Sequence, residues 1–228
     1  MFKKLFFTLV ICLFIKTNAQ DGTVSPYSYF GLGTFNPANT VENNAMGGLS
    51  IYGDSIHVNL QNPASYGLLK LTTYTVGVSH RRMALTSDTQ EKSTALTAID
   101  YLSVAMPIAE NIGIGFGITP VTSMGYILNS SAENVNGETI TNVFSGDGGL
   151  SKIYFSLGAA PIKNFTVGAS AFANFGTVNK ERVQSLSSVL FGTIDRRTSR
   201  MNGFNFQMAA NYTPNITDKL TLYTSFVH

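Results

Sequence analysis

The stretch IGIGFGIT, residues 112–119, decides the fold. Large apolar side chains alternate here with glycine or threonine at every second position. Because successive residues of a β-strand point to opposite faces, one face of this strand is apolar and the other is nearly bare. The pattern therefore predicts a strand in a sheet with two unlike faces.

The same period of two recurs on both sides of this stretch and gives about seven strands. The other runs begin at Tyr74, Leu102, Ile153, Phe165, Phe204 and Leu220. Short turn-like connections (107–111, 161–164 and 213–219) alternate with long polar excursions (81–93, 123–149 and 176–200). Short turns at one end and long loops at the other are typical of an outer-membrane barrel. We therefore expect an all-β fold, an antiparallel transmembrane β-barrel.

The strand count predicts a fragment of that barrel. Single-chain bacterial barrels have an even number of strands, whereas this chain stops at His228 inside the last of about seven. We expect an open sheet with an unpaired edge, because an incomplete barrel cannot close.

Composition agrees with a barrel and excludes several function classes. Charged residues make up 12% of the chain, against 21 glycines, 16 phenylalanines and 10 tyrosines. The net charge of +2 forms no basic stripe, so we expect no nucleic-acid partner. The only cysteine is Cys12, and His57, His80 and His228 stand far apart, so no metal site is expected. No cofactor motif and no catalytic constellation is present, and we expect no enzyme.

The N-terminus predicts export. Lys3 and Lys4 precede an apolar run, Leu5–Ile15, and Thr17-Asn18-Ala19 forms a small-residue cleavage site. Residues 1–19 are therefore expected to be a cleaved signal peptide, and residues 72–228 the barrel in the bacterial outer membrane. Residues 20–71 carry several prolines and no sustained alternation. They are expected to form a plug or hatch, with a loosely ordered periplasmic tail as the alternative.

Three short motifs carry a family resemblance. They are Asn44-Ala45-Met46-Gly47-Gly48, Gly53-Asp54-Ser55 and Asn62-Pro63-Ala64-Ser65. Together they resemble the N-terminal hatch of the FadL/TodX-type outer-membrane transporter family. The stretch from Tyr27 to Gly33 is similar to exported outer-membrane proteins of Bacteroidetes-like bacteria. The resemblance spans the chain after residue 19, although only Asn62, Pro63 and Ala64 form a specific hatch motif.

The resemblance implies a barrel of roughly fourteen strands, of which this chain would supply half. It also implies passive uptake of hydrophobic molecules such as long-chain fatty acids, with membrane lipid, an apolar ligand and protein partners around the barrel. A lateral exit at a kinked third strand would fall at Pro120, which otherwise only ends that strand. Met124, Tyr126, Ile127 and Leu128 are candidates for a ligand groove, or else plain strand extensions. A secretion-system or surface-protein docking subunit is the alternative function, because a fold alone does not fix a function.

Overall fold

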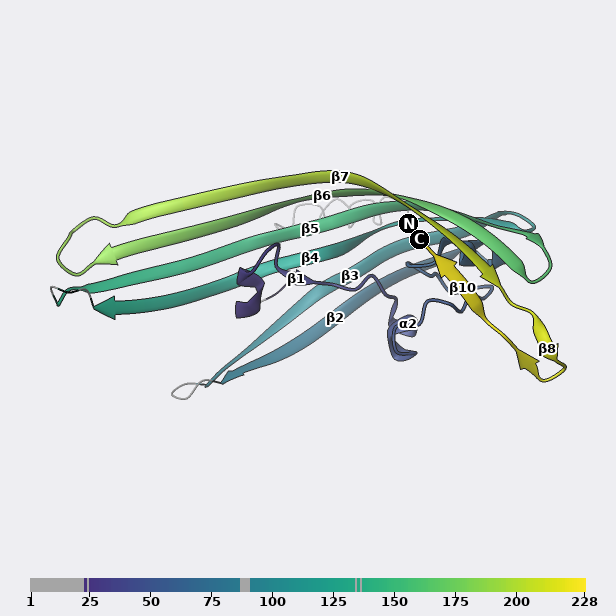
Figure 1. Ribbon diagram of the computed structural model, residues 1–228, viewed down its shortest axis with the longest axis horizontal. Coiled ribbons are helices and arrows are strands. Elements are labelled where there is room, and N and C mark those ends of the chain that lie inside the picture. Colours follow the sequence, from purple (N-terminus) through teal and green to yellow (C-terminus); the bar gives the residue numbers. More distant parts are fainter. Residues whose placement is uncertain (1–22, 24, 87–90, 134, 136) are drawn as a thin grey trace, which may run out of the picture.

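The computed structural model describes residues 23, 25–86, 91–133, 135 and 137–228, and the expected signal peptide lies outside them. Its main body is one eight-stranded antiparallel sheet in the order β10-β7-β6-β5-β4-β3-β2, with β1 paired to β4 (Figure 1). A separate two-stranded sheet joins β8 to β9. The elements are η1 (Pro26–Tyr29), β1 (Thr34–Phe35), α2 (Val41–Ala45), η2 (Pro63–Leu68), β2 (Thr73–Thr86), β3 (Glu91–Ala109), β4 (Ile112–Glu133), β5 (Thr139–Ile162), β6 (Phe165–Leu186), β7 (Thr193–Tyr212), β8 (Asn215–Thr217), β9 (Leu220–Thr221) and β10 (Thr224–Val227).

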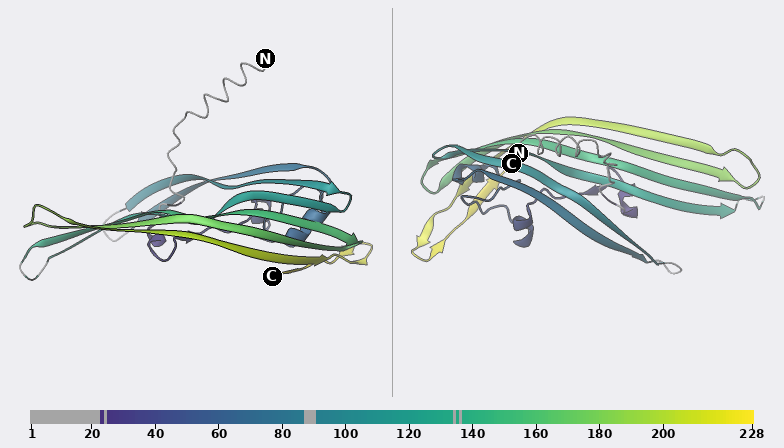
Figure 2. Two further views of the ribbon diagram at one scale, coloured as in Figure 1. Left: turned by 90° about the horizontal axis from the view of Figure 1, so that it is seen from above. Right: turned by 180° about the vertical axis from the view of Figure 1, so that it is seen from behind.

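The sheet is curled into a half-barrel, so the all-β antiparallel class is confirmed in part (Figure 2). Its path ends at β10 and β2, which are not paired to each other, as expected for an open sheet. Within the described residues, no helix is long and apolar enough to cross a membrane.

The two faces of the sheet differ as the alternation predicted. Large apolar side chains on the outer face are exposed, for example Phe116, Phe155 and Phe206. On the opposite, inner face, β4 and β5 carry buried small residues such as Gly113, Gly115, Ser156 and Gly158, together with the buried Tyr154. An exposed row of this kind would be costly in water and is stabilised by a lipid environment.

The N-terminal segment, residues 25–71, lies against the inner face and supplies the core. Val58, Leu60 and Tyr66 pack with Tyr101 and Tyr154 of the sheet, and all are less than 7% exposed. The segment is an extended chain with three short helices, not a separate helical domain. Its role as a plug in a closed barrel stays a prediction.

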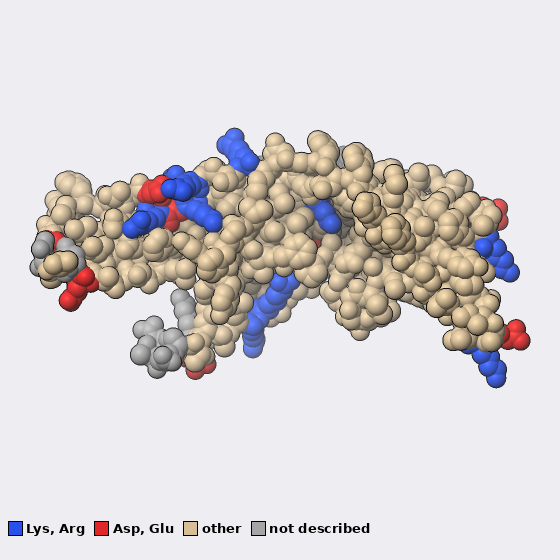
Figure 3. Space-filling model, in the orientation of Figure 1, with Lys and Arg blue, Asp and Glu red and all other residues tan. Residues whose placement is uncertain are grey.

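The prediction of long polar loops is wrong, because strands occupy most of these residues. The pairing of β4 with β5 continues to Glu133↔Thr139, and that of β6 with β7 continues to Gln184↔Thr193. Polar residues occupy both faces of the strands there. The alternation of apolar and polar residues is therefore lost, although the backbone hydrogen bonds between the strands continue. On the face shown in Figure 3, charged side chains gather toward the two ends of the long axis, and the middle carries few. The strands therefore extend well beyond the apolar region, at the end that is expected to face the outside of the cell.

Candidate functional site

The glycines of the inner face form a floor on which η2 lies. A Cβ atom at Gly113 would lie 2.1 Å from the Tyr66 carbonyl oxygen, and one at Gly158 would lie 2.5 Å from the Pro63 carbonyl oxygen. A Cβ atom at Gly168 would lie 2.4 Å from the Pro63 carbonyl carbon. These contacts are closer than van der Waals distance, so only glycine allows the two backbones to meet. The sheet face that carries glycine in the sequence pattern is therefore the face against which the N-terminal segment packs.

The predicted hatch motif lies on this glycine face together with Tyr66 and Gly67. Asn62 caps η2 by accepting a hydrogen bond from the Ala64 amide at 3.1 Å. Its side-chain amide donates to Asn211 Oδ1 at 2.9 Å and to Ser225 Oγ at 3.0 Å. Asn62 is fully buried, so these bonds fix η2 against both β7 and β10.

A second contact region lies further along the strands, at η1. The Ser28 hydroxyl accepts a hydrogen bond from the Gly125 amide at 3.2 Å and lies 3.3 Å from the Gly125 carbonyl oxygen. The Lys180 ammonium donates to the carbonyl oxygens of Tyr29 at 3.1 Å and Gly31 at 3.2 Å. The Tyr29 ring also packs edge-on against Tyr126, with centroids 5.3 Å apart. These contacts anchor the start of the segment to β4 and β6.

A β-bulge in β4 at Pro120 coincides with a change in the neighbours of that strand, which itself continues to Glu133. The register of β4 against β5 shifts between Pro120 and Thr122, which is a β-bulge. On its other side, β4 pairs with β3 only as far as Ile118, which pairs with Leu102. Beyond that pair, toward the start of β3, strands β2 and β3 diverge from β4, as Figure 1 shows. Pro120 therefore lies close to the point at which β3 and β4 separate.

The chain's own N-terminal segment takes part of the place that β3 leaves. Thr34 of β1 pairs with Ser123 and Phe35 pairs with Thr122, and the Asn36 amide donates to the Val121 carbonyl oxygen at 2.8 Å. Beside this contact is a cavity of about 500 Å³. It is lined by Thr97 and Asp100 of β3, by Pro120 and Ser123 of β4, and by Arg81 of β2.

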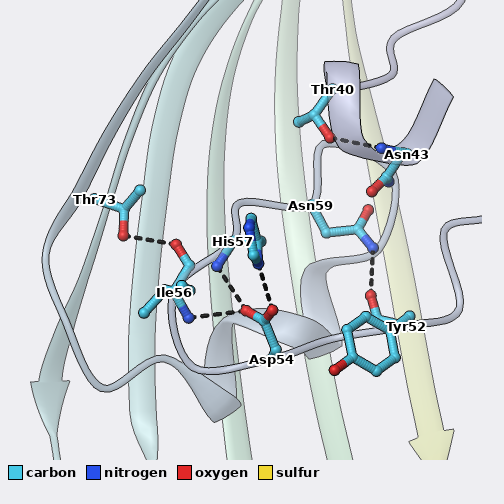
Figure 4. A network of polar contacts seen from close by, with 8 residues as sticks. All are labelled: Thr40, Asn43, Tyr52, Asp54, Ile56, His57, Asn59 and Thr73. Carbon is cyan, nitrogen blue, oxygen red and sulfur yellow. Dashed lines mark hydrogen bonds and ion pairs between the residues drawn. The ribbon is translucent and has the colours of Figure 1, made fainter. Parts of the chain in front are cut away.

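A polar turn holds the middle of the N-terminal segment (Figure 4). Asp54 Oδ1 accepts hydrogen bonds from the amides of Ile56 at 2.8 Å and His57 at 2.7 Å, and the His57 ring pairs with Oδ2. Partial burial acts to raise the pKa of the Asp54 carboxyl, but the hydrogen bonds from His57 and Ile56 outweigh it and hold the pKa below its ordinary value. The turn is tied to β2, because Thr73 Oγ1 donates to the Ile56 carbonyl oxygen at 2.7 Å.

The predicted ligand groove does not form one surface. Met124 is fully buried and Tyr126 is 7% exposed, and both pack with Val178 against the inner face. Leu128 packs at the edge of the same cluster, whereas Ile127 is 75% exposed. Three of the four residues therefore support the sheet's own packing. In the described part of the chain, no cluster of three or more metal-ligating side chains is found.

Sequence reasoning missed the contacts of β1 and Ser28 with β4. A strand of two residues has no detectable period, and one serine among many carries no signal of its own. The Ser-Pro-Tyr-Ser-Tyr run at residues 25–29 contains two tyrosines, but nothing in it identifies β4 as its partner.

The fold and the site define a class: a curled antiparallel sheet with an exposed apolar outer face and an N-terminal segment fixed on its inner face. The family comparison is more specific. The BamG family model matches residues 1–228, so the chain belongs to the BamG family, which is associated with the BAM complex of the bacterial outer membrane. No curated protein and no solved structure matches the chain.

This membership corrects the expectations that the hatch motifs suggested. The chain does not belong to the FadL/TodX transporter family, and the fatty-acid channel, porin-like transport and apolar ligand are not supported. The secretion-system or surface-protein docking role is not supported either. An Asn-Pro-Ala turn that caps a short helix on a glycine floor is a structural solution, and it does not specify transport. Protein partners and an outer-membrane location agree with the family.

Proposed function

We propose that this protein acts in outer-membrane protein assembly as a component of the BAM complex. The match of the BamG family over residues 1–228 carries the proposal. We also propose that the sheet forms part of a transmembrane barrel wall, that residues 1–19 are removed as a signal peptide, and that the protein acts by binding partners, without catalysis.

Two features of the fold support a partner-binding role. The outer face around Phe116, Phe155 and Phe206 would hold the sheet in the lipid layer, because exposed apolar rows of this kind are stable there. The polar extensions of β4 to β7 reach well beyond this apolar region. Strands that extend so far beyond the membrane present a large protein surface to other subunits.

The experiment that tests the function is depletion of the protein in its own bacterium. The proposal predicts that folded outer-membrane barrel proteins decline in the membrane fraction, while inner-membrane proteins stay constant. Heat-dependent migration on a denaturing gel separates folded from unfolded barrels. If uptake of apolar compounds fell while the level of folded barrels was unchanged, the proposed function would be wrong.

A further inference from the structure

The first half of β3, from Glu91 to Tyr101, has an unpaired backbone edge on the side that faces β4. From Glu91 to Tyr101, β3 pairs with β2 on one side, and among the described residues no strand pairs with it on the other. This edge differs from the ends of the sheet at β2 and β10, which further strands of a barrel would pair. Because β3 and β4 are consecutive and joined at their base, strands added at the ends of the sheet do not fill the space between them.

The facing edge of β4 shows how such a place is filled. There, Phe35 of β1 pairs with Thr122, and the Ser28 hydroxyl accepts a hydrogen bond from the Gly125 amide. An extended piece of polypeptide thus already adds to one of the two parted edges. The edge of β3 has backbone groups of the same kind and, in the described chain, no such cover.

The β3 edge also lacks the features that keep an edge strand from pairing. Residues 93–99 read STALTAI, with no charge, proline or glycine. Native edges are normally blocked by charged residues, proline, bulges or a covering segment. The bulge opposite Gly77 lies at the base of this stretch, so Ser93 to Ile99 remain in regular register with β2. A regular, uncharged edge of this length is suited to accept another strand.

We infer that the β3 edge from Ser93 to Ile99 is a strand-addition site for an extended segment of a partner protein. This rests on the proposed function for the partner's identity, a member of the same assembly complex, but the pairing itself rests on the open edge. Backbone groups supply the affinity in this mode, and alternate side chains supply the specificity.

The surroundings of the edge favour a peptide over a lipid chain. The cavity beside the edge contains Arg81 and Asp100, with Nη2 3.4 Å from Oδ1, and Ser79 Oγ donates to the same Asp100 oxygen at 2.9 Å. An acyl chain offers no donor or acceptor to these groups or to the backbone edge. The segment we expect has one polar face toward this cavity and one face of small apolar side chains beside Ala95 and Ile99.

Photo-crosslinking in the native membrane tests the inference. The residue p-benzoylphenylalanine is placed at Thr97, which is exposed and lies on the open edge. The matched control position is Thr177, which is also an exposed threonine but lies on β6, between paired strands on both sides. We expect a crosslinked second polypeptide from Thr97 at a yield at least about tenfold above that from Thr177.

A second variant tests whether pairing is responsible. With the crosslinker at Thr97, the substitution Ala95→Lys should lower the adduct yield about tenfold, because a lysine on an edge strand opposes strand addition. Thr177→Lys should leave the yield unchanged. Heat-dependent gel migration confirms that both variants fold. An adduct yield that is insensitive to Ala95→Lys would overturn the inference.

The outcomes separate this inference from the proposed function. If BAM subunits co-purify with the protein but Thr97 gives no adduct, only an adduct within its own chain, or an adduct with a second copy, the strand-addition site is wrong and the function stands. If Thr97 captures a protein that is not part of the complex and no BAM subunit co-purifies, the proposed function is wrong while the open edge still pairs.

Discussion

The close approach of η2 to the sheet predicts a large difference between two glycine-to-alanine substitutions. In Gly158→Ala, the new Cβ would lie 2.5 Å from the Pro63 carbonyl oxygen and 2.6 Å from the Gly67 nitrogen. Ordinary contact is about 3.5 Å or more, so backbone atoms on one side must move by about 1 Å. Overpacking of this kind costs about 1–3 kcal/mol. In Gly203→Ala, on β7, the Cβ meets nothing within 4 Å.

The control substitution should even be favourable. Replacing glycine by alanine at a compatible backbone position stabilises a protein by about 0.4–1 kcal/mol. The two variants are therefore expected to differ by roughly 1.5–4 kcal/mol in the free energy of unfolding. Urea unfolding of the protein in lipid bilayers, followed by tyrosine fluorescence, measures this difference. Trypsin cleavage after Lys70 reports separately whether the N-terminal segment has left the floor.

Gly158→Ala should be less stable than the unmodified protein, and Lys70 should be cleaved faster in it. Gly203→Ala should be at least as stable as the unmodified protein, with unchanged cleavage. If the two variants unfold within about 0.5 kcal/mol of each other and Lys70 is equally protected in both, the glycine floor does not hold η2.

Three further predictions follow from the polar contacts. Asn62→Ala removes the cap of η2 and the acceptor of the buried Ala64 amide. It should cost about 1–3 kcal/mol in urea unfolding, whereas equal stability would mean that the cap is dispensable. Because the folded-state pKa of Asp54 is lowered, the stability from its turn is present above the ordinary pKa of 3.8 and is lost as the pH falls below that value. Asp54→Asn should flatten this part of the curve of unfolding free energy against pH. An unchanged curve would show that the ionised Asp54 carboxylate does not stabilise the turn. Lys180→Met should speed proteolysis near Tyr29 without a change in sheet content by circular dichroism, and unchanged proteolysis would show that the contact does not anchor η1.

The sheet was predictable from the sequence because its two faces differ within the apolar region. Alternation at residues 112–119 showed which residues face outward, and the exposed Phe116 agrees. The same alternation could not show why the inner face is bare, since the reason is Tyr66, far away in the chain. Beyond the apolar region the period vanishes, and the paired ends of β4 and β5, which reach the pair Glu133↔Thr139, were predicted to be loops.

The candidate site was predictable only in outline. Proline lacks a ladder donor, so Pro120 indicated a break, and the structure shows a register shift there and the parting of β3 from β4. The sequence did not show that Phe35 would pair with β4, or that Met124 and Tyr126 would be buried. Such contacts depend on tertiary packing between distant residues, which local pattern does not encode. The lateral exit at Pro120 belonged to a transporter role that the family assignment does not support.

Co-purification from native membranes tests the central claim most directly. The protein, tagged and expressed at its natural level, is extracted in mild detergent, and its partners are identified and counted by mass spectrometry. Assembly in the BAM complex predicts that the barrel subunit of that complex is recovered in near-stoichiometric amount. Recovery of the folded protein alone, or with a bound apolar compound and no BAM subunit, would contradict the account.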